Sequence, residues 1–285
     1  MKNTHPGKFV LIEGLNGAGK TTQAQLLAKW LRDIGVVAEC NHEPTTERFG
    51  YLIRKIIDRK PYIPLAYELR ACVNGLLIKN VLARRLKYSG YPLKKSFLVL
   101  LKKALDKLVN KVELTEEERQ AIFIADRLYD IVLNITPKLR CGVSIIQDRY
   151  DISSYIHGMA SGLPFNVLQR WHKLCLGRYY LVPDLVIYYW APMDVAMSRN
   201  NQSGKIIDIY EKKIEFLKNI ERAALELFHI PTLEPFLNKG FYCKGSLNIW
   251  DDAEVPYYWI NAEGTKEEVF KITKDIITDH FKMIN

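Results

Sequence analysis

The chain has 285 residues, 48% of them hydrophobic and 26% charged, and carries a formal net charge of +9 at pH 7. These values fit one sizeable α/β domain with insertions, whereas no apolar run approaches the ~18 residues that cross a bilayer and the N-terminus lacks the apolar core of a signal peptide. The five cysteines are scattered without a CxxC pair, which argues against a structural zinc site, so we expect a reduced, cytoplasmic protein.

The first predicted elements are a buried strand over 8–14 and an amphipathic helix over 21–35. The segment between them matches GxxxxGK[ST] at every fixed position: Gly14, Leu15, Asn16, Gly17, Ala18, Gly19, Lys20 and Thr21. Backbone N–H groups wrap a phosphate only where side chains leave room, and the helix N-terminus adds its positive dipole end. The alternative is a glycine turn that only connects strand to helix. The complete motif in this setting predicts an ATP site, in which Lys20 contacts the β and γ phosphates and Thr21 provides a ligand for Mg²⁺.

Further strands and helices alternate along the rest of the chain. Strands are predicted over 36–40, 142–150, 183–190 and 256–262, and helices over 47–58, 113–135, 163–177, 207–228 and 265–281. The helix over 113–135 begins with a capping box and is expected to end at Pro137. This alternation is typical of a doubly wound parallel sheet flanked by helices.

Charged residues follow two of the predicted strands, where open α/β sheets bind their ligands. Glu43 follows the second strand, Asp148 and Arg149 end the third, and Arg127 lies on the preceding helix. Because a planar guanidinium holds two phosphate oxygens at once, two such arginines indicate a second anionic ligand. The alternatives are that Arg149 forms an ion pair with Asp148 or Glu43 and that Arg127 lies on a solvated helix face.

A basic insertion over about 60–112 contains most of the excess charge. Residues 79–111 include ten lysines and arginines and one acidic residue. Apolar residues recur at helical spacing between Phe97 and Val112, which predicts a basic amphipathic helix. Such a helix can bind a membrane surface, nucleic acid or a partner, but we favour packing of its apolar face on the protein body or on a second subunit of a homodimer. A second insertion, at about 231–255, is expected to be a surface excursion.

Several segments together resemble thymidylate kinases in content and order: IEGLNGAGKTTQAQLLAKWL, HEPTTERFGYLIRKIID, AIFIADR, QDRYDISSY and PDLVIYY. The resemblance covers about residues 8–58, 113–229 and 256–283. It implies a single P-loop domain over 1–285 with a five-stranded parallel sheet and a mobile lid at about 197–208. It also implies transfer of a phosphoryl group from ATP to dTMP, giving dTDP.

The resemblance also implies roles for individual residues. The charges expected to act on the transferred group are Lys20, Arg127, Arg149 and Lys205. The ATP site would comprise residues 14–22, Thr22 included, with Arg199 in the lid. The acceptor would contact Glu43, Arg54, Arg127, Arg149 and Tyr155, although Tyr155 fits a core aromatic equally well. Thr21 and Asp148 would lie near Mg²⁺ or its water shell.

The chain departs from the family pattern at some of these positions. Asn16 stands where the family usually has an acidic residue, His42 replaces an arginine, and Ile209 replaces the arginine expected after Asp208. The acceptor base is therefore open, with dTMP as the leading expectation. One alternative is a deoxynucleoside kinase that uses Glu13 or Glu43 as a base. Another is a nucleotide-dependent binding module that engages nucleic acid or membrane through residues 79–111.

Overall fold

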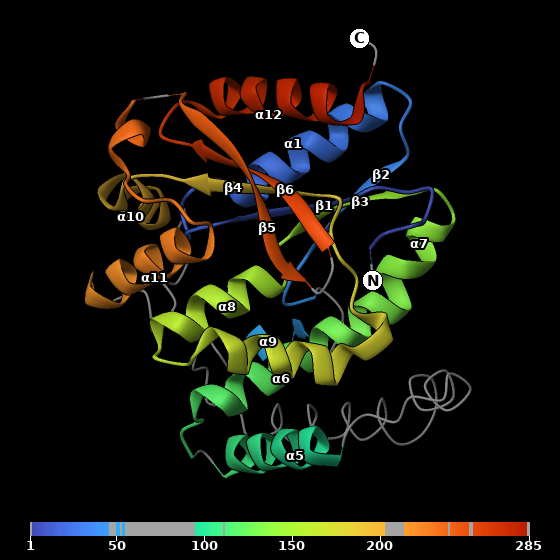
Figure 1. Ribbon diagram of the computed structural model, residues 1–285, viewed down its shortest axis with the longest axis vertical. Helices are drawn as coiled ribbons and strands as arrows, with labels where there is room; N and C mark the ends of the chain where they lie inside the picture. The colour runs from blue at the N-terminus through green and yellow to red at the C-terminus, as the bar shows by residue number, and fades with distance from the viewer. Residues whose placement is uncertain are drawn as a thin grey trace.

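The computed structural model describes residues 2–45, 50–51, 53–54, 95–110, 112–202, 214–238, 240–250 and 253–283. A sheet with strand order β2-β3-β1-β4-β6-β5 runs through the middle of the molecule (Figure 1). Its strands are β1 (Phe9–Gly14), β2 (Ala38–His42), β3 (Ser144–Asp148), β4 (Leu185–Trp190), β5 (Tyr242–Trp250) and β6 (Ala253–Asn261). All neighbours except β5 and β6 pair in parallel, which confirms the predicted five-stranded parallel sheet.

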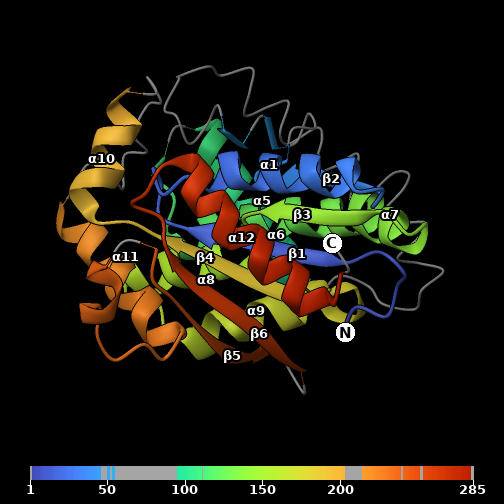
Figure 2. The same cartoon turned by 90° about the horizontal axis from the view of Figure 1, so that it is seen from above.

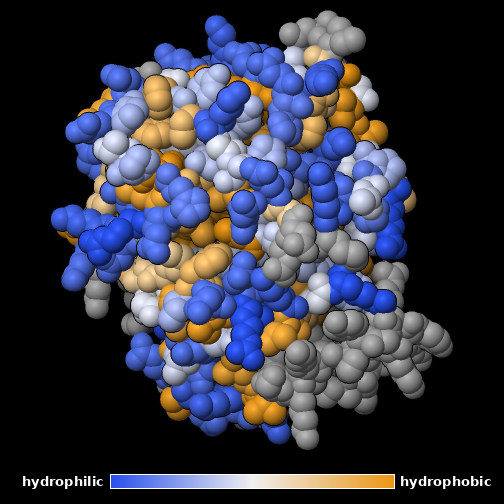
Figure 3. Space-filling model, in the orientation of Figure 1, coloured by the Kyte–Doolittle hydropathy of each residue, from blue (hydrophilic) through white to orange (hydrophobic). Residues whose placement is uncertain are grey.

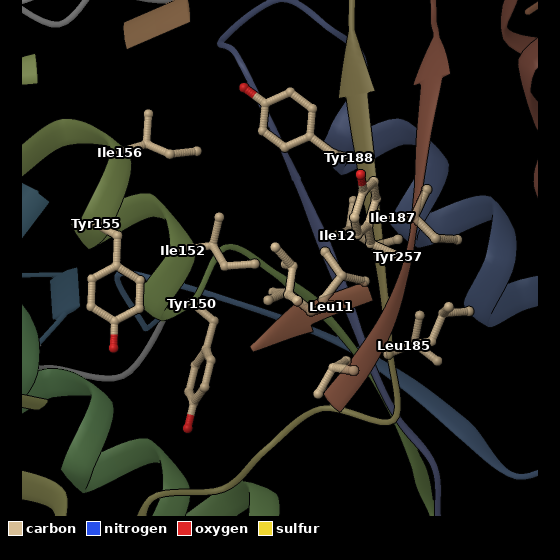
Figure 4. Packing of buried hydrophobic residues seen from close by; sticks show 14 of the residues in the cluster. Leu11, Ile12, Tyr150, Ile152, Tyr155, Ile156, Leu185, Ile187, Tyr188 and Tyr257 are labelled. Atoms are coloured by element: carbon tan, nitrogen blue, oxygen red, sulfur yellow. The ribbon is translucent and has the colours of Figure 1, made fainter. Parts of the chain in front are cut away.

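Helices cover both faces of this sheet (Figure 2). One face carries α1 (Lys20–Asp33) and α12 (Lys266–Phe281), and the other carries α6 (Glu116–Asp130), α8 (Asp151–Ala160), α9 (Phe165–Leu176) and α11 (Ile214–Leu227). Every residue of β1, β3 and β4 is buried as a result, which explains the apolar runs FVLI in β1 and LVIYYW in β4. Figure 4 shows Ile152 of α8 lying between that helix and Leu11 and Ile12 of β1.

The predicted helix end at Pro137 is wrong. The helical path continues from α6 through a π-helical turn, Ile131–Ile135, into α7 (Thr136–Arg140). Pro137 falls in the first turn of α7, where its missing N–H would have no intrahelical partner, and the wider preceding turn accommodates its ring. The helical path therefore ends at Arg140, shortly before β3 begins at Ser144.

The segment over 231–255 is not a surface excursion, as predicted, but part of the sheet and the core. It contains a short 3₁₀ helix, Glu234–Leu237, followed by β5, which pairs antiparallel with β6. The side chains of Phe236, Leu247 and Trp250 are each at most 2% exposed. Alternation of polar and apolar residues in SLNIW is the sequence feature that could have indicated a half-buried strand here.

The described part of the basic insertion forms α5 (Lys95–Val109), which packs on α6 (Figure 1). Its apolar face buries Leu101, Ala104 and Leu105. Lys107 donates to the Glu118 carboxylate of α6 at 2.8 Å. Packing on the protein body thus accounts for this helix, whereas residues 60–94 of the predicted insertion lie outside the described residues.

The face drawn in Figure 3 is mostly hydrophilic, with hydrophobic side chains interspersed. Among the described helices, none combines the length and the apolar character that a membrane span requires. The other described elements are a 3₁₀ helix, Gly177–Tyr179, and α10 (Met193–Gln202), which leads toward the predicted lid.

The role of β5 in the core can be tested by truncating two leucines of the same segment. Leu247→Ala removes a fully buried side chain, so we expect it to lower the free energy of unfolding by about 2–5 kcal/mol. Leu237→Ala, at a side chain that is 67% exposed, should change it by at most about 0.5 kcal/mol. Denaturant unfolding of both variants measures the difference, and equal losses would contradict the placement of β5.

Candidate active site

The glycine-rich loop leaves β1 in a conformation that other residues rarely adopt. Gly14 has φ 138°, and a Cβ there would lie 2.0 Å from the Tyr189 carbonyl oxygen of β4. Gly17 has φ 83°, and a Cβ there would lie 2.1 Å from the carbonyl oxygen of Ala196 in α10. Both contacts are with backbone atoms, which a side chain cannot displace, so the loop path depends on these glycines.

Lys20 and Thr21 begin α1, where the backbone N–H groups of the first turn point out of the helix. The Lys20 side chain is 5% exposed and its Nζ donates to the Leu15 carbonyl at 2.6 Å, so the ammonium group lies folded over the loop. The Thr21 hydroxyl donates to Asp148 Oδ2 of β3 at 2.5 Å. This hydrogen bond joins the loop to the end of the neighbouring strand. Thr22, the last residue predicted in the ATP site, is exposed in the same turn.

Arg149 follows β3 and bends toward the glycine-rich loop. Its backbone is in the left-handed region, with φ 71°. One guanidinium nitrogen donates to the Asn16 side-chain oxygen, and the other donates to the Ser153 hydroxyl at 3.0 Å. Neither of the ion pairs that we considered as an alternative, with Asp148 or with Glu43, is the contact that places this side chain. A neutral amide therefore connects the arginine to the phosphate loop.

Glu13, directly before the loop, is held by the start of α8. Its carboxylate accepts from the N–H groups of Tyr150 at 2.9 Å and Ser153 at 3.1 Å, and from the Ser153 hydroxyl at 2.8 Å. Burial raises the pKa of Glu13, while the Arg149 charge and the hydrogen bonds from α8 oppose that increase.

Glu43 and Arg127 form an ion pair in the interior. Arg127 Nη2 lies 2.6 Å from Glu43 Oε2, and Arg127 Nε lies 3.1 Å from both carboxylate oxygens. The arginine is 1% exposed, so the alternative of a solvated helix face is wrong. Burial lowers the pKa of Arg127, but the adjacent Glu43 carboxylate outweighs this effect and raises it, so the guanidinium stays charged.

Both terminal nitrogens of Arg127 have further partners in the protein. They reach the Tyr150 carbonyl at 2.8 Å, the Ser154 hydroxyl at 3.2 Å and His172 Nε2 at 2.7 Å. His172 Nδ1 bonds the Leu168 carbonyl, and burial followed by the Arg127 charge lowers the pKa of His172 to about 3, so the ring is neutral. Its Nε2 can then accept from the arginine.

Asp126, next to Arg127, holds the same loop from the other side. Its two oxygens accept from the Thr45 N–H and the Thr45 hydroxyl, each at 2.8 Å. The residue after the glutamate–proline pair is therefore also attached to α6. The sequence analysis did not identify Asp126, Ser153 or His172 as supporting residues. For Asp126, the one available signal was its position next to Arg127 in the ADR segment.

Tyr155 lies in the core. Its hydroxyl bonds that of Tyr180 at 2.6 Å, and Asp151 Oδ2 accepts from Tyr180 at 2.5 Å and from the Trp250 indole N–H at 2.6 Å. In Figure 4 the ring of Tyr155 points in the same direction as that of Tyr150, and the residue is 0% exposed. These contacts agree with the core alternative that the sequence left open.

Two more of the predicted site residues, Arg199 and Arg54, contact loops beside the glycine-rich loop and β2. Arg199 of α10 donates to the carbonyls of Ala262, Glu263 and Gly264, at 2.8, 2.8 and 3.0 Å, and so fixes the loop after β6. Arg54 donates to the Pro44 carbonyl and contacts the His42 ring. The predicted lid beyond Gln202, with Lys205, lies outside the described residues, as does Ile209 directly after it.

The buried pair can be compared with an exposed one. Arg127→Met leaves the Glu43 carboxylate buried without its partner, so we expect the free energy of unfolding to fall by about 3–5 kcal/mol. Lys138→Met breaks a 2.6 Å pair with Glu39 whose side chains are 39% and 49% exposed, and should cost at most about 1 kcal/mol. Denaturant unfolding at pH 7 measures both losses. A small and equal loss in the two variants would contradict a structural role for the buried pair.

Comparison with known proteins agrees with this geometry. The sequence profile described as thymidylate kinase matches residues 12–89 and 77–236. A probable thymidylate kinase of Thermococcus gammatolerans is 29% identical over 222 residues, which are 78% of this chain and 83% of that protein. The thymidylate kinase of Trichormus variabilis is 24% identical over 279 residues, 97% of this chain and 98% of the relative. The profile spans more than half of the chain, and the chain belongs to the thymidylate kinase family.

Proposed function

We propose that this protein transfers the γ-phosphoryl group of ATP to dTMP, giving ADP and dTDP. The observation that carries the proposal is the junction between the glycine-rich loop and the end of β3. Two hydrogen bonds span it, from Thr21 to Asp148 and from Arg149 to Asn16. A donor held by the loop and an acceptor held by Arg149 would therefore meet at adjoining strand ends, as in-line transfer requires.

On the donor side, Lys20 would neutralise the β and γ phosphates, while the N–H groups of the loop and of α1 bind their oxygens. Arg199 donates to the carbonyls of residues 262–264 and would thereby hold the loop after β6 in place beside the ATP site. On the acceptor side, Arg149 would bind the phosphate of dTMP, and Arg54, which donates to the Pro44 carbonyl, would approach it from the glutamate–proline loop. Arg127 would act through Glu43, since each of its three side-chain nitrogens already contacts a protein acceptor.

Thr21 and Asp148 fit the predicted Mg²⁺ site. Asp148 is 6% exposed, and its Oδ1 has no hydrogen-bond partner in the part of the chain that the structure describes. A hydroxyl and a carboxylate are the oxygen ligands that Mg²⁺ prefers beside a nucleoside triphosphate. The ion would neutralise charge on the phosphates. These two side chains would orient it or its water shell.

The contacts of Glu13 and Glu43 disfavour the alternative of phosphorylating a nucleoside hydroxyl. A general base needs a carboxylate oxygen within hydrogen-bond reach of the proton that it removes. Glu43 faces Arg127 with both oxygens, and Glu13 accepts three hydrogen bonds from α8. Both carboxylates are therefore already hydrogen-bonded within the protein.

We further propose that the whole chain forms one such domain, with its lid over 197–208. Homodimerisation, contact with nucleic acid or membrane through 79–111, and a cytoplasmic location stay predictions. The packing of α5 on α6 supports an insertion that is part of the enzyme body.

An acceptor screen tests the proposed reaction. Formation of ADP from Mg²⁺-ATP is expected to be fastest with dTMP, slower with other deoxynucleoside monophosphates and at background with thymidine, and chelation of Mg²⁺ should abolish it. A rate that rises with thymidine but with no monophosphate would indicate the deoxynucleoside kinase instead. No acceleration by any acceptor would refute both enzymatic assignments.

The loop lysine can be tested against a lysine of the same helix. Lys20→Ala removes a charge expected to stabilise the transferred group, so kcat/KM for ATP should fall by about 10²–10³. Lys29→Ala alters an exposed side chain two turns further along α1 and should leave kcat/KM within about twofold. Circular dichroism of both variants checks that they are folded. An active Lys20→Ala enzyme would remove Lys20 from the transfer.

A further inference from the structure

Glu13 occupies a position where a carboxylate is costly. It is 1% exposed at the end of β1, directly after the buried apolar run FVLI of the same strand. A buried carboxylate destabilises the fold unless its oxygens are well hydrogen-bonded. Its partners all come from the start of α8: the N–H groups of Tyr150 and Ser153 and the Ser153 hydroxyl. Tyr150, at the N-cap, provides no side-chain cap, so Glu13 caps α8 from a neighbouring strand.

The same contacts fix the unusual backbone turn at Arg149. This residue connects β3 to α8 with φ 71°, a backbone conformation that residues other than glycine rarely adopt. Its N–H bonds the Ile12 carbonyl at 3.0 Å, and its carbonyl accepts from the Gln147 side chain at 3.0 Å. The next N–H along the chain, at Tyr150, is the one that Glu13 accepts. The turn is thereby held on both sides of Arg149.

A second connection reaches the guanidinium itself. Ser153 Oγ accepts from Arg149 Nη1 at 3.0 Å and donates to Glu13 Oε2 at 2.8 Å. A hydroxyl has one proton, so donation to the carboxylate leaves the lone pairs of the oxygen for the arginine. Glu13 thus determines which way the serine hydroxyl points. Asn16 holds the other guanidinium nitrogen.

We infer that Glu13, acting through Ser153, is a positioning residue for Arg149: it aims the guanidinium at the acceptor phosphate beside the glycine-rich loop. This inference rests on the proposed phosphoryl transfer and deepens it. Glu13 touches neither nucleotide in this role. Glu13 lies at the end of β1, where the donor loop also begins. The same strand end would therefore position both the donor loop and the acceptor-binding arginine.

Two variants interrupt the connection at different points. Ser153→Ala removes the acceptor for Arg149 Nη1 but retains the N–H contact of residue 153 with Glu13. Glu13→Gln keeps the size of the side chain, but its amide nitrogen cannot accept the serine proton, and the charge facing Arg149 is lost. We expect kcat/KM for dTMP to fall about tenfold in Ser153→Ala and about a hundredfold in Glu13→Gln, with KM for ATP within about twofold of wild type.

Ser144→Ala is the matched control. Ser144 is a buried serine at the opposite end of β3, where its hydroxyl oxygen accepts from the Lys8 N–H at 3.2 Å. Its loss removes a comparable hydrogen bond far from the loop, so both kinetic parameters should stay within about twofold of wild type. A general loss of stability would lower the fraction of folded enzyme, and with it the apparent kcat, but would leave KM for ATP and for dTMP unchanged.

A double-mutant cycle separates positioning from a structural effect. If Ser153 acts through Arg149, adding Ser153→Ala to Arg149→Ala should cost less than about twofold further in kcat/KM for dTMP. Independent, multiplying losses would overturn the inference, as would wild-type kinetics in both Ser153→Ala and Glu13→Gln. A wild-type chain that neither phosphorylates nor binds dTMP in calorimetry would overturn the proposed function, and with it the role of Glu13. An active wild type with unaffected variants would overturn that role alone.

Discussion

The buried ion pair between Arg127 and Glu43 is the constraint on which the acceptor side of the molecule depends. A guanidinium removed from water needs an acceptor for each of its N–H groups, and α6 alone cannot provide them. The acceptors come from the loop after β2, from α8 and from α9. Because the unpaired charge would be so costly, these segments are fixed relative to one another. Asp126 adds a second attachment of the same loop to the same helix.

The two halves of the proposed site are built by different means. The donor side is shaped by backbone: Gly14 and Gly17 pass so close to neighbouring carbonyl groups that no side chain fits. The acceptor side is shaped by side chains, with buried Glu13 and Glu43 each supporting an arginine. Rigid supports of this kind hold charges in place before the substrates arrive, which is the main contribution that a protein makes to phosphoryl transfer.

The predictions that failed concern elements whose local sequence competes with their surroundings. Pro137 is a helix breaker in isolation, yet a π turn lets the helical path continue because the proline falls in a first turn. The segment over 231–255 contains glycine and proline, but Leu247 and Trp250 find partners on β6 and α8, and burial outweighs local propensity. Tyr155 was compatible with two environments, and only packing distinguished them.

The sequence by itself determined the phosphate loop, the parallel strands with their buried apolar runs and both capping boxes, since each depends on residues within a few positions of one another. It also placed charged residues at the strand ends. Only the tertiary structure decided what these charges contact: Glu43 meets Arg127 across 84 residues of chain, and Glu13 meets Ser153 across 140. Such pairs leave no periodic pattern, because their partners are chosen by the pairing of β1 with β3 and by the need to neutralise buried charge.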